Sequence, residues 1–135
     1  MTKQIVVESR RKSLANLQKA WPEATLVDVT SKGLEPWVRF SPFWPHGGIP
    51  IPNSSGLKAQ SVEGLWQGLK VFEKADVDPA KWAITNMKSI KRSARSLGPV
   101  RGHRYGIESD QLLGYREARL KIYLPAYRWI LDHNL

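Results

Sequence analysis

Three polar side chains recur at helical spacing between residues 61 and 74: Glu63, Gln67 and Lys70. Their i, i+4, i+7 spacing places them along one border of a helix. A carboxylate beside an amide and an ammonium could stabilise a developing oxocarbenium ion, or act as base or nucleophile in glycosidic cleavage. The alternative is an ordinary solvated stripe of paired helix side chains.

A helix over residues 61–74 must position this stripe. Ser61 is the expected N-cap, so Glu63 falls in the first turn, where the helix dipole favours its ionised form. Gly64 and Gly68 share another side, and each costs about 1 kcal/mol relative to Ala. We therefore expect a neighbouring element or a ligand to approach the backbone there. One apolar arc forms the predicted core face: Val62, Leu65, Trp66, Leu69 and Phe72.

A long loop over residues 41–60 precedes this helix and contains four prolines. A loop of this length inside a compact domain is usually functional or disordered, and its prolines and aromatics argue for the former. Phe43 and Trp44 could stack on a base or anchor the loop in the core. His46 is interpreted as a structural loop residue.

Residues 88–104 hold six basic side chains and no acidic one. On a helix predicted over residues 87–97, the cations recur at i, i+3, i+4, i+7, which gives either a phosphate-binding face or a solvated face. They are Lys88, Lys91, Arg92 and Arg95. On the apolar-rich last helix, Arg116 and Arg119 must be paired or face a ligand, and ion pairs with Glu117 and Asp110 are the simpler expectation.

Composition limits the function classes. The 135 residues carry a net charge of +9, which favours polyanionic partners such as nucleotides or nucleic acid. The chain has no cysteine, which excludes disulfides and thiolate metal sites, and its three histidines lack ligand spacing. No apolar run approaches the roughly 20 residues of a membrane span, and the N-terminus lacks a signal-peptide core, so we expect a cytoplasmic protein without membrane association.

The other patterns predict a mixed chain with more helix than strand. Strands are expected over residues 3–7, 25–30 and 37–40, and residues 99–105 are expected to be irregular or a short strand. Helices are expected over residues 8–20, in a short turn that begins at Asp78-Pro79, and over residues 109–133 with a break at Pro125. The expected fold is a single small α+β domain over residues 1–135, mostly helical with a few short strands.

The loop and helix together resemble the NADAR (YbiA-like) family. An SPF loop is followed by a Gly-Pro-rich segment and a helix of the form T-V-E-H-x-x-Q-A-x-K, and here residues 61–70 read SVEGLWQGLK. Val62, Glu63, Gln67 and Lys70 match, whereas Gly64 replaces the histidine. KRSARSLG, at residues 91–98, is similar to the family's A-K-x-x-G segment. The resemblance covers residues 37–130, and the family's usual C-terminal segment with an acidic residue and Trp-Gly has no counterpart.

NADAR proteins are N-glycosidases, so the resemblance implies cleavage of a ribosyl N-glycosidic bond without a cofactor or metal. The implied substrate is a nucleotide sugar or an ADP-ribosyl group, including ADP-ribose on guanine of DNA or RNA. Glu63 is then the catalytic residue, and the expected substrate-binding residues are Phe43, Trp44, Gln67, Lys70, Lys91, Arg92 and Arg95. Two alternatives remain: a non-enzymatic basic module that binds nucleic acid, and a degenerate family member that binds a nucleotide without cleaving it.

Overall fold

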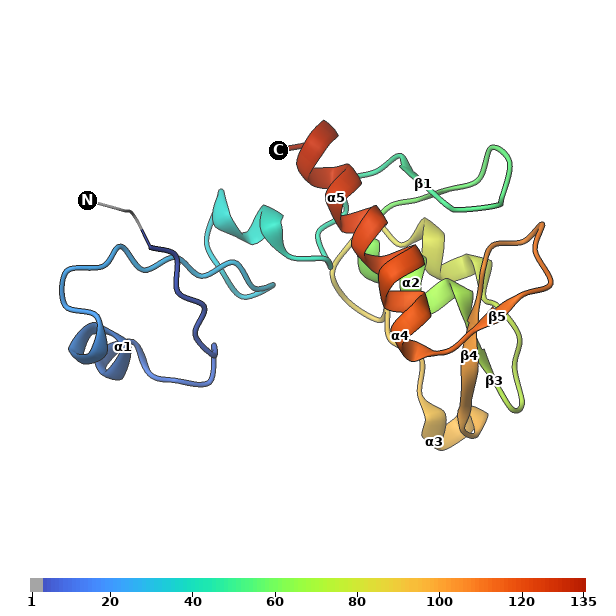
Figure 1. Ribbon diagram of the computed structural model, residues 1–135, viewed down its shortest axis with the longest axis horizontal. Helices are drawn as coiled ribbons and strands as arrows, with labels where there is room; N and C mark the ends of the chain where they lie inside the picture. The colour runs from blue at the N-terminus through green and yellow to red at the C-terminus, as the bar shows by residue number, and fades with distance from the viewer. Residues whose placement is uncertain (1–3) are drawn as a thin grey trace.

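The structure is a computed structural model that describes residues 4–135, and helix α2 (Val62–Leu69) lies at the centre of its body (Figure 1). All eight residues of α2 are buried. Ser61 is the N-cap, and its Oγ accepts a hydrogen bond from the Gly64 N–H at 2.9 Å, as predicted. The helix is shorter than expected because Lys70 already begins strand β3 (Lys70–Phe72).

Two small antiparallel sheets flank this helix. The three-stranded sheet has the order β3–β4–β5, with β4 at Val100–Arg104 and β5 at Leu112–Leu113. Lys70 of β3 lies directly opposite His103 of β4. The predicted long loop contains the second sheet, a hairpin of β1 (Ile49–Pro50) and β2 (Lys58–Ala59).

The chain ends in a continuous helical run that packs on α2. It consists of α4 (Tyr115–Ala118), the π-helical turn η3 (Arg119–Tyr123) and α5 (Leu124–His133). Pro125 has no N–H to donate to the carbonyl four residues earlier, and a wider turn precedes it. The helix therefore does not break at Pro125 but continues through it, with a π-turn just before. The run begins at Tyr115 and not at residue 109 as predicted, because Leu112–Leu113 form β5.

Both glycines of α2 make room for a neighbouring element rather than for a ligand. The 3-10 helix η2 (Pro79–Ala83) begins at Asp78, as predicted, and packs against α2. A Cβ on Gly64 would lie 2.6 Å from the Lys81 carbonyl oxygen, and one on Gly68 would lie 2.0 Å from Nε1 of Trp82. Buried apolar residues complete the core, among them Leu65, Leu69, Leu113, Ile122 and Ile130.

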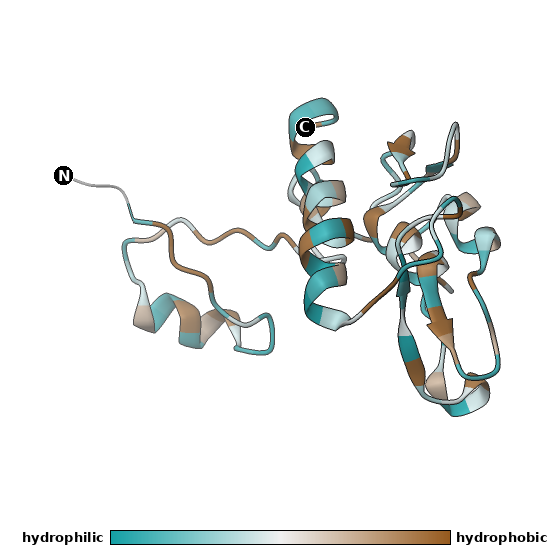
Figure 2. Cartoon of the chain, turned by 45° about the vertical axis from the view of Figure 1, so that its right-hand side comes forward, coloured by the Kyte–Doolittle hydropathy of each residue, from teal (hydrophilic) through white to brown (hydrophobic). Residues whose placement is uncertain are grey.

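The N-terminal part of the chain differs from the expectation. Residue 3 lies outside the described residues, and neither residues 4–7 nor residues 25–30 form a strand, because no neighbouring segment pairs with them. Helix α1 (Leu14–Ala20) has no buried residue. Residues 37–40 form a 3-10 helix, η1 (Trp37–Phe40), instead of a strand. Figures 1 and 2 show this segment extending away from the body with hydrophobic stretches along it.

The predicted basic helix over residues 87–97 is also wrong. Only α3 (Ala94–Leu97) is helical, and it starts after Ser93, whose Oγ accepts from the Arg95 N–H. Ser89 has a φ of 59°, which a right-handed helix does not allow. The four cations therefore do not share one helical face. The small α+β fold with a few short strands is confirmed.

Candidate active site

Glu63 is a buried carboxylate with a hydrogen-bond donor on each oxygen. Its side chain is 7 % exposed. Oε1 accepts from Nε2 of Gln67 at 3.0 Å, which is the i, i+4 contact that the sequence spacing allows. Oε2 accepts from the Tyr123 hydroxyl at 3.1 Å. Since Glu63 and Gln67 are both buried, the solvated-stripe interpretation is wrong.

Tyr123 reaches Glu63 from the π-turn of the C-terminal helical run, sixty residues away in the chain. Burial raises the pKa of its hydroxyl far above the ordinary value, and the neighbouring Glu63 charge adds to this effect. The hydroxyl therefore stays protonated and donates to the carboxylate. The sequence analysis did not assign Tyr123 to the site, because no short-range spacing relates it to Glu63.

Two cations lie close to this carboxylate. Burial lowers the pKa of Lys70, which is half-buried; Glu63 opposes this shift, whereas Arg92 and Lys91 add to it. The Arg119 guanidinium carbon lies 4.2 Å from the centre of the Tyr123 ring and 5.9 Å from that of Trp66. No ion pair joins Arg119 to an acid within residues 4–135, and Glu117 pairs with Lys121 at 3.7 Å. The expected pairing of Arg119 is therefore wrong, and its charge faces the site.

Arg92 orients the site instead of presenting its charge to solvent. Its backbone N–H donates to Oε1 of Gln67 at 3.1 Å, which leaves the Gln67 amide N–H free to face Glu63. Its guanidinium donates to the carbonyls of Gln67, Lys70 and Asp76 and lies over the Phe72 ring at 4.7 Å. These bonds commit three guanidinium donors to backbone carbonyls, so the geometry gives Arg92 a positioning role.

The aromatic loop contacts the start of α2 at one point. The Pro42 carbonyl accepts from the Glu63 N–H at 2.8 Å, which places Phe43 next to the site. Nζ of Lys91 lies 5.7 Å from the centre of the Phe43 ring, so these two predicted residues are brought together.

Two other predicted binding residues, Trp44 and Arg95, make their contacts away from Glu63. Trp44 stands under the Arg39 guanidinium at 5.8 Å. Arg95 is exposed on α3. His46 Nε2 lies 2.7 Å from the Arg39 carbonyl oxygen, which fits the structural role expected for it.

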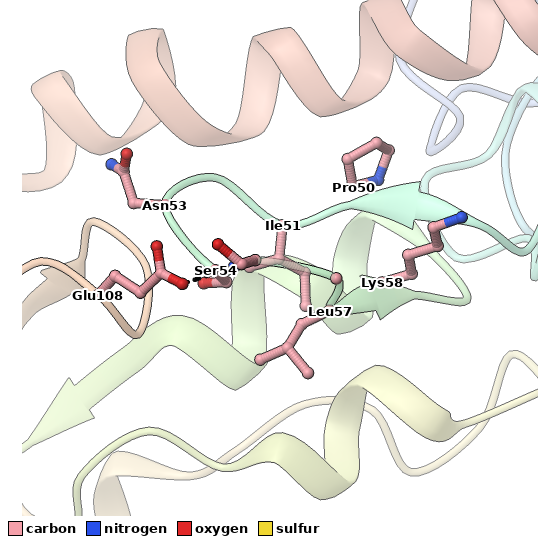
Figure 3. A pocket seen from close by; sticks show the side chains of 9 residues that line it. Pro50, Ile51, Asn53, Ser54, Leu57, Lys58 and Glu108 are labelled. Carbon is pink, nitrogen blue, oxygen red and sulfur yellow. Dashed lines mark hydrogen bonds between the residues drawn. The ribbon is translucent and has the colours of Figure 1, made fainter.

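Two open hollows lie on the surface, and Glu63 lines neither. One, of about 340 Å³, is formed by the β1–β2 hairpin and Glu108, whose Oε1 accepts from the Ser55 N–H at 2.9 Å (Figure 3). None of the predicted site residues line it. The other, of about 580 Å³, is bordered by Lys81, Lys91 and Arg92 together with Asp76 and Asp78. Glu63 itself is 7 % exposed.

The residues that the structure describes hold no cluster of metal ligands. Within residues 4–135, no three His, Asp or Glu side chains lie close enough together to hold a metal ion. In the same residues, no helix combines the length and apolar character of a membrane span.

The sequence was also compared with known proteins. A family model described as "Family of unknown function (DUF6939)" matches residues 9–135, and the chain belongs to this family. No curated protein and no solved structure matches the chain. The description of the family names no activity.

Proposed function

We propose that this protein is an N-glycosidase-like hydrolase that cleaves a ribosyl N-glycosidic bond in a nucleotide-type or ADP-ribosyl substrate, as its resemblance to NADAR proteins implies. The observation that carries the proposal is the arrangement at Glu63. A buried carboxylate is fixed by Gln67 and Tyr123, and cations at Lys70 and Arg119 adjoin it. Burying a charge is costly even when hydrogen bonds offset part of the cost, and such a cost is expected where a function requires the group.

The chemistry needs one carboxylate and one water. The bond between ribose C1 and the base nitrogen breaks, and the electron pair leaves with the nitrogen. The negative charge of Glu63 stabilises the oxocarbenium ion that develops at C1. Glu63 then takes a proton from the attacking water, whose oxygen bonds to C1, and the departing base gains a proton overall.

The surrounding groups have distinct roles in this proposal. The Tyr123 hydroxyl and the Gln67 amide hold the carboxylate in place. Lys70 and Arg119 attract the phosphate groups of the substrate. Phe43, with Lys91 over its ring, offers a surface on which the base can stack.

The test is turnover by wild type and Glu63→Gln, measured by mass spectrometry on ADP-ribosylated guanine DNA and a panel of nucleotide N-glycosides. We expect wild type to release ADP-ribose from the modified DNA, or free base from a nucleotide N-glycoside, and turnover to fall by about 100-fold or more in the variant. Glu108→Gln is the matched control, because it removes the same charge at the hairpin, away from the site, and should keep turnover. Unchanged turnover in Glu63→Gln would remove this residue from the mechanism.

A non-enzymatic module that binds nucleic acid or nucleotides is the second candidate. The exposed cations Lys88, Lys91 and Arg95 have no acidic partner within residues 4–135, which leaves their charge available for a phosphate backbone. This candidate requires salt-sensitive binding that falls when the three are changed together and is independent of Glu63. Retained nucleic acid without any release of base would favour it.

A further inference from the structure

His103 is a buried polar residue that the proposed mechanism does not use. Its side chain is 2 % exposed, and neither ring nitrogen has a hydrogen-bond partner among the described residues 4–135. The two other histidines differ: His46 lies against the Arg39 carbonyl and His133 against the Trp129 carbonyl. Trp82 Nε1 is also unpaired, but its indole packs on Gly68 and its role is accounted for by that contact.

The unpaired nitrogens make His103 costly to the fold. Burial lowers the pKa of the imidazole to about 3, and the nearby Lys70 charge adds to this effect, so the ring is neutral under ordinary conditions. A neutral imidazole has one N–H donor and one acceptor nitrogen, and both have lost water without gaining a partner. A phenylalanine could fill the same flat space without that cost.

The position of His103 ties it to the Glu63 helix. Its ring stacks on Trp66 with centroids 3.6 Å apart. Trp66 in turn meets the Tyr123 ring edge-on at 5.3 Å, and Tyr123 donates to Glu63. Trp66 is three residues after Glu63 in α2, so both project from the same side of the helix.

Lys70 is the movable group beside this ring. It lies directly opposite His103 in the β3–β4 pair, and side chains of directly opposed residues lie on the same face of a sheet. Lys70 is only half-buried, and its ammonium ends a flexible four-carbon stem. A ligand phosphate that attracts this ammonium would draw the stem away from His103.

We propose that His103 is a ligand-binding residue of the Glu63 site, where its imidazole hydrogen-bonds a hydroxyl of the bound ribosyl group after Lys70 has moved aside. A hydroxyl both donates and accepts, so it can pair with either nitrogen of a neutral ring. A phosphate anion only accepts hydrogen bonds, so the cations Lys70 and Arg119 suit it better than the imidazole does. This inference rests on the proposed function and deepens it.

The first test follows the imidazole directly in long-range ¹H–¹⁵N NMR spectra of the wild-type protein. Three histidines make the spectrum simple to assign. ADP-ribose, the product expected from an ADP-ribosyl substrate, is the probe, and pyrophosphate, which has no sugar hydroxyl, is the control. We expect ADP-ribose to shift one ring nitrogen of His103, with no such shift on pyrophosphate and none in His46 or His133.

The second test uses His103→Phe, which keeps a flat ring over Trp66. We expect a higher thermal midpoint than wild type, since the unpaired nitrogens are gone, together with about tenfold weaker ADP-ribose binding by calorimetry. His133→Phe is the matched control, because His133 also stacks on a tryptophan, Trp129, at 4.4 Å; its binding should not change. A purely structural His103 would show no such opposition between stability and affinity.

The outcomes separate this inference from the proposed function. If ADP-ribose shifts the Trp66 indole but not His103, or if His103→Phe binds as wild type does, the inference is overturned while the hydrolase proposal stands. If His103 shifts but wild type releases neither ADP-ribose nor base from any substrate, the hydrolase proposal fails and the binding role stands. Absence of any response to ADP-ribose overturns the role of His103.

Discussion

Replacing Gly68 by alanine should disturb the surface on which α2 packs against η2. Gly68 lies on the side of α2 that faces the buried Trp82 of η2. An added Cβ would lie 2.0 Å from Nε1, 2.5 Å from Cδ1 and 2.8 Å from Cε2 of that indole. A Cβ atom essentially never lies within 3.0 Å of a heavy atom that is not its neighbour in the chain, so the ring or the helix must move by about 1 Å.

The magnitude follows from two opposing effects. Overpacking a well-packed core costs about 1–3 kcal/mol, and a clash of this depth with a Trp82 ring only 5 % exposed belongs at about 3 kcal/mol. Alanine favours the helix over glycine by about 1 kcal/mol. The expected net loss in free energy of unfolding is about 2 kcal/mol. Since Glu63 and Gln67 lie on the same helix, turnover should fall as well.

Urea denaturation followed by tryptophan fluorescence measures this loss. With a typical m-value of about 2 kcal/mol/M, the midpoint of Gly68→Ala should drop by about 1 M. Gly114→Ala is the matched control, because a Cβ there meets nothing within 4 Å and the φ of −69° suits alanine. Its midpoint should stay close to that of wild type. A Gly68→Ala protein as stable as Gly114→Ala would refute the reasoning about Trp82.

Two further predictions concern the polar groups around α2. Tyr123→Phe removes the hydroxyl that donates to Oε2 of Glu63 and should lower the free energy of unfolding by about 1.5–3 kcal/mol in urea titrations, since hydrogen bonds to charged groups are the strong ones. Tyr127→Phe is the control, because it loses only a bond to the Phe40 carbonyl and should therefore lower the free energy of unfolding less. An equal loss in the two variants would contradict a charged Glu63. The imidazole of His103 protonates near pH 6.5 when unfolded but only at about pH 3 when folded, so the unfolded state binds the extra proton in between, and stability should fall by about 2 kcal/mol from pH 7 to pH 5. His103→Phe should flatten that dependence, and an unchanged slope would assign it to other groups.

Sequence periodicity predicted the parts of the site that lie within one helix. The Ser61 cap, the buried apolar arc and the Glu63–Gln67 contact all follow from local spacing, and the structure has them. The glycine pair indicated a close approach, although only the structure shows that η2 makes it. Local rules were sufficient here because cap and spacing depend on residues a few positions apart.

The errors have a common physical origin. Residues 4–7 and 25–30 have strand composition, but a strand forms only where a partner lies alongside, and none does. The basic segment has helical spacing, but its backbone hydrogen-bonds to α2 through Arg92 and so leaves the helical path. Tyr123 comes from the C-terminal run and His103 from β4, and no short-range pattern relates either to Glu63.

The burial of polar groups on one helix is the strongest argument that the site has a function. All of α2 is buried, and two of its eight residues are Glu63 and Gln67, where apolar side chains would pack more cheaply. A solvated stripe would have carried no such cost. His103, stacked on the same helix, adds a buried polar group whose ring nitrogens have no hydrogen-bond partner within residues 4–135. Burial of the Glu63–Gln67 pair and burial of His103 each lower the stability of the fold, and two such losses on one side of α2 are expected where stability is given up for recognition or chemistry. Polar groups that are held away from water interact most strongly with a ligand that enters the site.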